Sequence, residues 1–454
     1  MHLTQITRRF AALMLVFFAT ACHANQAETS SLLQLIDAAY TEKAAQSISP
    51  QGELLDEVYK PSIWVEIRDK LALEAPDSPW VEQFARDYAK RGFMTSAGRR
   101  ALPYLDVILD EVKARKLPVE LALLPFIESA YQPSATSSVG AHGAWQFMPA
   151  TGRDFGLDAD RLREQRRNWI SASKAALTYL QTLYARFNHW HLAIAAYNCG
   201  EGRIQKALEK ARAQGKAGRF EDLNLPEETR QYVPRLFAVA RLIEDPHVYG
   251  ITLPDESTVP LTPMRLEYDI DVEMAARLAG VSEKQFRIWN PHIKGPLVAA
   301  AAHRELLLSI PAAFRLSDAI AANRGRTRLA TWSLVRLGDP MTLAEAAKHF
   351  QINPAQLESA NPVAKGYRYR AGSTLLIPRR QGTENLSLAL VQGSQLQTEP
   401  AIKRISYKVR GKESLAQIAE RHKISLAEVQ RWNPKVTERP KRGTALTLWV
   451  PINS

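Results

Sequence analysis

The sequence is poor in cysteine and has no long hydrophobic run outside its N-terminus. Two cysteines in 454 residues cannot build a disulfide scaffold or a cysteine-rich metal site, so we expect neither redox chemistry nor a structural zinc centre. Glycine and proline show no low-complexity pattern, and 46% hydrophobic residues are enough for packed cores, which excludes wholesale disorder. At roughly 150 residues per domain, the length predicts about three domains.

Residues 1–24 are expected to be an export signal. A basic pair precedes an apolar run at 10–19 that is shorter than the roughly 20 residues of a membrane-spanning helix. Cys22 follows Ala19-Thr20-Ala21, which resembles a lipoprotein cleavage box, so two alternatives remain: lipidation of Cys22, or ordinary cleavage after Ala21 or Ala24. Either one predicts a protein of the periplasm or cell envelope, and His23 after the cysteine favours an outer-membrane lipoprotein. Lipidation would make the membrane a partner.

The positive charge is concentrated at the C-terminus. The chain has 59 Lys and Arg against 47 Asp and Glu, a formal net charge of +12. Residues 401–454 hold twelve basic and four acidic residues, which accounts for +8 of that charge. A cationic C-terminal segment suits an anionic wall polymer. We do not expect nucleic acid as a partner, because an exported chain has little access to it.

Residues 31–250 show helical periodicity, with apolar residues three and four positions apart. Pro103, Pro118 and Pro149 are expected to interrupt this pattern and to separate helices of ordinary length. We divide the region into a helical N-terminal part, 31–116, and a catalytic part, 117–250. The proline- and threonine-rich stretch that follows predicts a domain boundary.

An internal repeat occupies the rest of the chain. The dipeptide Asn-Pro begins at residues 290, 361 and 433, at spacings of 71 and 72. Each dipeptide follows two short amphipathic runs and precedes an apolar strand, which predicts strand-helix-helix-strand units. These units resemble the LysM domain, a family that binds N-acetylated glycans. The third unit, 405–452, fits best. The second is 331–379, and the first, 264–312, is degenerate because of an alanine-rich insertion. We expect 380–404 to be a flexible linker.

One glutamate in the helical region is placed for acid chemistry. Glu128 ends an apolar run that begins at Leu121. Partial burial of a carboxyl raises its pKa and allows it to donate a proton near neutral pH, as the cleavage of a glycosidic bond requires. On its own, a solvated or capping glutamate would be the commoner explanation.

Three polar and aromatic segments accompany this glutamate. They are Gly143-Ala144-Trp145-Gln146, Ala195-Ala196-Tyr197-Asn198 and Glu228-Thr229-Arg230-Gln231-Tyr232. Sugar rings stack on aromatic side chains, and their hydroxyl and acetamido groups hydrogen-bond to amides and phenols. Together with Glu128, the three segments therefore predict a carbohydrate site.

The ordered motifs Glu-Ser, Gly-x-Trp-Gln, Ala-Tyr-Asn-x-Gly and Glu-Thr-x-x-Tyr-Val resemble the lytic transglycosylases of glycoside hydrolase family 23. The resemblance implies a mainly α fold, with a goose-type lysozyme-like catalytic domain followed by small α+β LysM modules. It also implies non-hydrolytic cleavage of peptidoglycan glycan strands without a cofactor or a metal. The residue roles that it implies are catalysis by Glu128, substrate binding by Ser137, Gln146, Tyr197, Asn198 and Tyr232, and support by Ser129 and Trp145.

Two other functions remain open. One is a lysozyme-like hydrolase of the same bond, although the candidate second carboxylates Asp154, Asp158 and Glu201 are poorly matched in position. The other is a non-catalytic envelope protein that binds peptidoglycan through its repeats. His189 and His191 lie two residues apart with no third ligand in register, which does not predict a metal site.

Overall fold

The computed structural model describes residues 62–254, 260–303, 305–322, 328–380 and 384–451. The expected export signal, Cys22 and residues 31–61 of the N-terminal helical part lie outside these residues. Within the described ranges, no helix is both long enough and apolar enough to cross a bilayer.

Residues 62–254 form one helical body around a single hydrophobic core. Buried side chains from both sides of residue 116 share this core, so the expected boundary between 31–116 and 117–250 has no counterpart in the packing. Leu105 of the first part and Leu124 of the second, for example, are both 0% exposed. The helices are α3 (Ile63–Arg68), α4 (Trp80–Lys90), α5 (Phe93–Ala114), η2 (Val119–Leu123), α6 (Leu124–Ser129), α7 (Pro149–Asp154), η3 (Gln165–Arg167), α8 (Trp169–Phe187), α9 (Trp190–Cys199), α10 (Glu201–Ala213), η4 (Phe220–Asp222) and α11 (Glu227–Glu244).

The prolines of this body do not all act as expected. Pro149 begins α7 and Pro118 immediately precedes η2, positions where the missing N–H costs nothing. The break expected at Pro103 is wrong, because α5 continues through this residue. Leu102 and Leu105 beside it are buried, and such packing along a long central helix outweighs the loss of one backbone hydrogen bond.

Each Asn-Pro repeat folds as a small module with two helices and an antiparallel pair of strands. In the first module β1 (Leu261–Arg265) pairs with β4 (Glu305–Ser309), in the second β5 (Trp332–Arg336) pairs with β7 (Thr374–Pro378), and in the third β9 (Ile402–Lys408) pairs with β10 (Ala445–Pro451). The helices between the strands are α12 (Val272–Leu278) and α13 (Glu283–Trp289), α15 (Leu343–Phe350) and α16 (Pro354–Ala360), and α18 (Leu415–Arg421) and α19 (Leu426–Trp432). The first module also has β2 (Ile270–Asp271), β3 (Leu297–Val298) and α14 (Ile310–Ala322).

The repeated asparagine joins the second helix of each module to its last strand. The Asn290 amide donates to the carbonyls of Phe286, at 3.1 Å, and Leu307, at 2.9 Å, and accepts from the Leu307 N–H at 2.8 Å. Asn361 and Asn433 make the same three contacts in their own modules. The asparagine therefore supplies hydrogen bonds that two different elements need, which explains its recurrence in all three copies.

Residues 384–404 are ordered and packed, contrary to the flexible linker expected over 380–404. The segment contains α17 (Leu388–Val391) and β8 (Thr398–Pro400), and β8 pairs with β6 (Tyr367–Tyr369) of the second module. Leu386 and Val391 are buried with Leu334 and Leu376 of that module. Because the segment is mostly polar, its sequence did not indicate that these few apolar residues would be buried.

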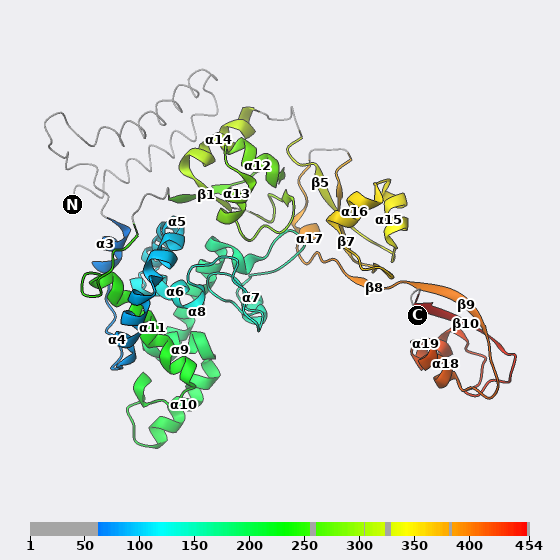
Figure 1. Cartoon of the computed structure of the whole chain (residues 1–454), viewed down its shortest axis with the longest axis horizontal. Helices are drawn as coiled ribbons and strands as arrows, with labels where there is room; N and C mark the ends of the chain where they lie inside the picture. The colour runs from blue at the N-terminus through cyan, green and yellow to red at the C-terminus, as the bar shows by residue number, and fades with distance from the viewer. Residues whose placement is uncertain (1–61, 255–259, 304, 323–327, 381–383, 452–454) are drawn as a thin grey trace.

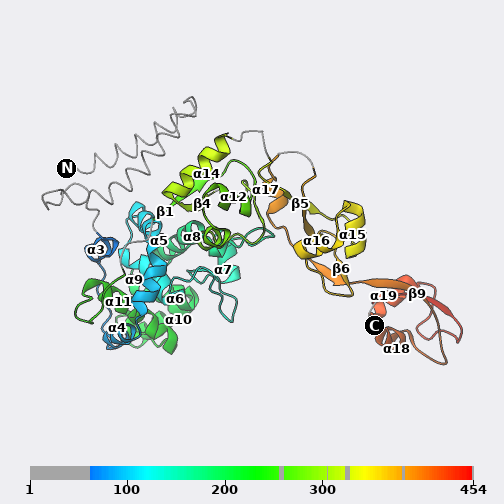
Figure 2. The ribbon, with the colours of Figure 1, turned by 45° about the horizontal axis from the view of Figure 1, so that its top comes forward.

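The modules follow one another away from the helical body. Figure 1 shows the first module beside α5 and α8, the second beyond it, and the third at the far end, reached through β8 and β9. Figure 2 shows the same separation of the third module from the helices. The first module touches the body directly, since the Tyr104 hydroxyl donates to the Ile288 carbonyl at 2.9 Å.

Candidate active site

Glu128 lies at the C-terminal end of α6, held there by a buried segment. Leu121, Leu124 and Phe126 are at most 1% exposed and anchor η2 and α6 in the core. The helix ends because Ala130 and Tyr131 adopt left-handed φ angles of 51° and 59°, with their N–H groups bonded to the carbonyls of Phe126 and Pro125. The carboxyl of Glu128 is thereby fixed at the partly open end of a buried element.

Two residues of α11, Tyr232 and Glu228, affect the pKa of this carboxyl. Burial raises the pKa of Glu128 to about 7; the hydrogen bond donated by the Tyr232 hydroxyl opposes the rise, and the nearby Glu228 carboxylate adds to it. Burial also raises the pKa of the Tyr232 phenol far above its usual value, so this group stays protonated and donates. Near neutral pH, Glu128 therefore exchanges between acid and base, as a proton-transfer catalyst must.

A loop at residues 135–147 forms the next part of the site; we call it the site loop. It is closed by hydrogen bonds from the Gly143 N–H to the Ala135 carbonyl and from the His142 N–H to the Phe147 carbonyl. The Ser129 hydroxyl donates to the Ala144 carbonyl at 2.9 Å, which attaches the residue beside Glu128 to this loop.

The site loop also contains three of the expected site residues. Trp145 is fully buried and donates from its indole to the Ser173 hydroxyl at 2.9 Å. Gln146 has a left-handed φ of 49°, and its side-chain amide donates to the Gly143 carbonyl at 2.7 Å. The Ser137 hydroxyl accepts from the Ala141 N–H at 2.9 Å and closes a local turn, a structural use that the sequence did not predict.

Tyr197 and Asn198 lie in the last turn of helix α9 and connect it to the same site. The Tyr197 hydroxyl donates to the Trp145 carbonyl at 2.9 Å. Burial, and to a smaller extent the charge on Glu128, raises the pKa of the Tyr197 and Tyr232 phenols well above its usual value. The Asn198 side-chain oxygen accepts from the Thr229 hydroxyl at 2.8 Å, which joins α9 to α11. The structure therefore gathers Glu128, Tyr232, Tyr197 and the site loop in one place.

Sequence reasoning passed over several residues of this site. Glu228 and Thr229 belong to the Glu-Thr-x-x-Tyr-Val motif, so the sequence marks their position, although it did not predict a role for them. Tyr179 of α8 packs against Tyr197 with ring centroids 5.5 Å apart, and nothing in its own sequence neighbourhood marks it.

Two of the three acids considered as second carboxylates have other contacts. Glu201 pairs with Arg186 at 2.7 Å, and the Asp158 carboxylate accepts from the Gln392 amide at 3.5 Å. Glu228, which was not among those acids, is the carboxylate whose charge reaches Glu128. Among the described residues, no three His, Cys, Asp or Glu side chains converge as metal ligands.

Comparisons with known proteins match this architecture. The sequence profile described as "Transglycosylase SLT domain" matches residues 108–220, and the LysM domain profile matches residues 407–440. The chain is 32% identical over 423 residues to "Membrane-bound lytic murein transglycosylase D" of Escherichia coli (strain K12), covering 90% of this chain and 88% of that protein. It is 30% identical over 146 residues to "Soluble lytic murein transglycosylase" of the same organism, covering 31% of this chain and 23% of that protein.

Among solved structures, the lytic transglycosylase Slt of Pseudomonas aeruginosa, an inactive mutant, aligns at 27% identity with a TM-score of 0.26, over 33% of this chain and 25% of that one. The 70-kDa soluble lytic transglycosylase of Escherichia coli aligns at 23% identity with a TM-score of 0.27, over 37% and 30%. The two profile matches confirm the predicted fold class, a helical lysozyme-like domain followed by a LysM domain, which is the third module. Because the identity of 32% extends over most of both chains, the chain belongs to the family of membrane-bound lytic murein transglycosylase D.

Proposed function

We propose that this protein is a peptidoglycan lytic transglycosylase with Glu128 as its single catalytic acid and base. The substrate is the β-1,4 bond between N-acetylmuramic acid and N-acetylglucosamine, and the product is a 1,6-anhydromuramyl end. The observation that carries the proposal is a carboxyl whose pKa is raised to about 7 by burial and which accepts a hydrogen bond from Tyr232 at the end of a buried helix.

Over the whole reaction, Glu128 gives up one proton and takes one back. Protonated Glu128 gives its proton to the glycosidic oxygen, and the bond from that oxygen to the anomeric carbon breaks with its electron pair going to the leaving sugar. The muramyl 6-hydroxyl oxygen then forms a bond to the anomeric carbon, and the Glu128 carboxylate takes the hydroxyl proton. No water is consumed, so no second carboxylate is needed to activate one.

The surrounding residues have supporting roles in this proposal. Tyr232 donates to Glu128 and stabilises the carboxylate formed in the first step, and Ser129 holds the end of α6 against the site loop. Tyr197 and Asn198 bind the sugar and its acetamido groups, as do Ser137 and Gln146 of the site loop. Trp145, being buried, anchors the loop in the core.

A direct test compares the wild type with Glu128→Gln, which keeps the size of the side chain but removes its acidity. Purified sacculi are digested, and the muropeptides are analysed by mass spectrometry. We expect 1,6-anhydro ends from the wild type and a loss of at least about 10³-fold in rate for the variant. Undiminished digestion by Glu128→Gln would refute the assignment.

Hydrolysis is the second candidate, because Glu228 provides a negative charge near Glu128. A hydrolase would use such a carboxylate to activate water. Reducing ends in place of anhydro ends in the same mass spectra would establish it. In that case Glu228→Gln would lose activity as completely as Glu128→Gln.

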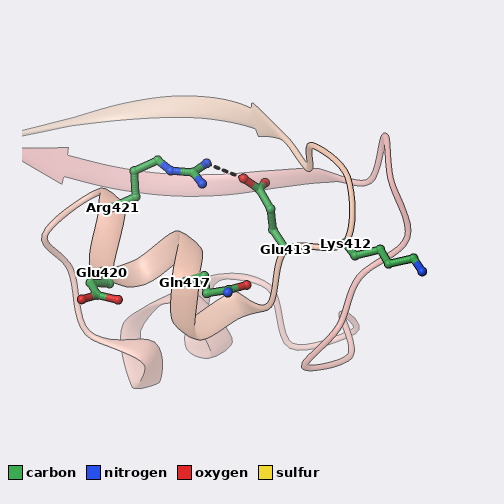
Figure 3. A pocket seen from close by; sticks show the side chains of 5 residues that line it. All are labelled: Lys412, Glu413, Gln417, Glu420 and Arg421. Atoms are coloured by element: carbon green, nitrogen blue, oxygen red, sulfur yellow. Dashed lines mark ion pairs between the residues drawn. The ribbon is translucent and has the colours of Figure 1, made fainter.

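We also propose that the third module tethers the enzyme to the wall. A hollow of about 530 Å³ lies beside α18. Its lining residues, drawn in Figure 3, are Lys412, Glu413, Gln417, Glu420 and Arg421. Glu413 pairs with Arg421 at 2.5 Å, and the Tyr407 hydroxyl donates to Glu413 at 2.6 Å. Polar groups fixed in this way, on a module with a high positive charge, suit an anionic glycan polymer.

The proposed location is the cell envelope, with Cys22 as a lipid anchor in the outer membrane. Support comes from the N-terminal sequence and from the membrane-bound relative. Cys22→Ser is expected to move the protein from the membrane fraction to the soluble fraction of the envelope. An unchanged distribution would favour ordinary cleavage after Ala21 or Ala24.

A further inference from the structure

The first module is joined to the helical body by backbone contacts as well as side chains. Its residues 290–303, which lie between α13 and β4, meet residues 158–165 of the body. The Glu164 N–H donates to the His292 carbonyl at 2.8 Å, and the Lys294 N–H donates to the Leu162 carbonyl at 2.8 Å. Arg163 and Ile293 form an antiparallel bridge between these contacts. The two segments pair as neighbouring strands do, so the contact fixes their register.

The alanine-rich insertion that makes this repeat degenerate is part of the contact. The Arg163 guanidinium donates to the Ala302 carbonyl at 2.6 Å and pairs with Asp160 at 2.7 Å. Ala299 and Ala302 are at most 3% exposed and pack in one cluster with Leu162. Small side chains let the two backbones approach closely. The insertion therefore has a use, which is docking onto the catalytic domain.

The second module contacts the same segment. The Arg161 guanidinium donates to the Ala360 carbonyl at 3.1 Å and to the Asn361 side chain at 3.0 Å, and the Arg161 N–H donates to the Ser394 hydroxyl at 3.2 Å. Residues 158–165 are therefore held by both modules. Figures 1 and 2 show that the third module lies away from this contact.

On its other side, this segment supports the site loop. Glu164 and Arg166 form a two-point ion pair, at 2.9 and 2.8 Å, and both side chains are at most about 10% exposed. The Arg166 guanidinium donates to the carbonyls of Gly140 at 3.0 Å and Phe147 at 3.3 Å. A Cβ on Gly143 would lie 1.9 Å from the Arg166 carbonyl oxygen, which shows how closely the loop sits on this segment.

The site loop in turn touches the catalytic group's neighbours, through Ser129 to Ala144 and Tyr197 to Trp145. We propose that the first module is a structural part of the catalytic domain, and that it positions the site loop through Glu164 and Arg166. Glu164 and Arg166 are positioning residues, since they act through the loop and not on the sugar. The kinetic part of this inference rests on the proposed function. The structural part does not.

The test weakens the docking from the side of the module. Ala302→Glu places a charged side chain in the buried contact, and Ala321→Glu makes the same change at an exposed position of α14 in the same module. Hydrogen exchange of the full chain is followed by mass spectrometry. We expect faster exchange in residues 135–147 for Ala302→Glu and no change for Ala321→Glu.

The kinetic measurement uses a soluble, peptide-free glycan. We expect kcat to fall by tenfold or more for Ala302→Glu and for Glu164→Gln, with KM changed less than about threefold, because displacement of a site by about 1 Å costs up to 10²-fold in rate. A general loss of folded protein would scale kcat with the active fraction, but it would not speed exchange in the site loop alone.

The result that overturns the inference is wild-type exchange in residues 135–147 together with wild-type kcat in Ala302→Glu. Exchange in α12 and α13 shows whether the module itself remains folded. The inference also fails if the module unfolds while the site loop keeps its protection. A wild type that forms no anhydro ends would instead refute the proposed function, and the exchange measurement would still decide the coupling.

Discussion

The pKa of Glu128 predicts the pH dependence of the reaction. A general acid must be protonated in the free enzyme, so kcat/KM should fall as pH rises through the folded-state pKa of about 7. At pH 6 about 90% of the enzyme is in the active form, and at pH 8 about 9%. An ordinary glutamate with a pKa of 4.5 would leave only about 0.3% protonated at pH 7.

Two substitutions on α11 should move this midpoint in opposite directions. Tyr232→Phe removes the hydrogen bond that lowers the pKa of Glu128, so the midpoint should move to higher pH. Glu228→Gln removes the negative charge that raises this pKa, so the midpoint should move to lower pH. Glu227→Gln, one residue earlier on the same helix, is the matched control, because Glu227 does not contribute to the shift.

The assay is kcat/KM on a soluble glycan from pH 5 to 9 at constant ionic strength. The comparison uses the pH midpoints of kcat/KM for the variants. Absolute rates are not compared, because Tyr232→Phe also removes a hydroxyl group from the site. A profile that is flat through pH 7, or shifts of the same sign for the two variants, would refute the account of how this carboxyl is tuned.

The remaining predictions concern stability and tethering. The folded protein binds the Glu128 proton more tightly than the unfolded chain, so stability is lost as pH rises from 4.5 through 7. Urea unfolding should therefore show Glu128→Gln gaining about 2–3 kcal/mol on the wild type between pH 5 and pH 8, and a pH-independent difference would contradict this. Asn433→Ala breaks three hydrogen bonds and should destabilise the third module by about 2–3 kcal/mol, seen as faster amide exchange in β10, whereas the exposed Gln430→Ala should not. Deletion of residues 405–454 should weaken binding to insoluble peptidoglycan, most clearly at low salt, and leave cleavage of a short soluble glycan nearly unchanged; equal loss of both would count against tethering.

The pattern of residues along the sequence was sufficient to predict most of the helices and strands and most residues of the candidate site. The helical periodicity, the capping serines at Ser414 and Ser425, and the alternation in the last strands each depend on neighbouring residues, and the third module was accordingly the clearest. The order of the four motifs, through its resemblance to a known family, pointed to Glu128, Tyr197 and Tyr232, which the structure brings together. The helices, caps and strands could be predicted from the sequence because short-range geometry produces them.

Local pattern failed where distant contacts decide the outcome. Pro103 was expected to end a helix, but α5 continues through this residue because Leu102 and Leu105 beside it are buried in the core. Residues 380–404 were expected to be a flexible linker, but most of them are held in place by a few buried apolar residues and by the pairing of β8 with β6.

The sequence by itself determined which residues make up the proposed site, because a glutamate at the end of an apolar run and the aromatic and amide residues of the later motifs resemble a known family in type and order. Only the tertiary structure decided how that site is supported. The degenerate first repeat docks through its insertion, and the buried Glu164–Arg166 pair links this docking to the loop beside Glu128. Such a link joins segments more than 100 residues apart, and its energy depends on burial and register, which exist only after the chain has folded.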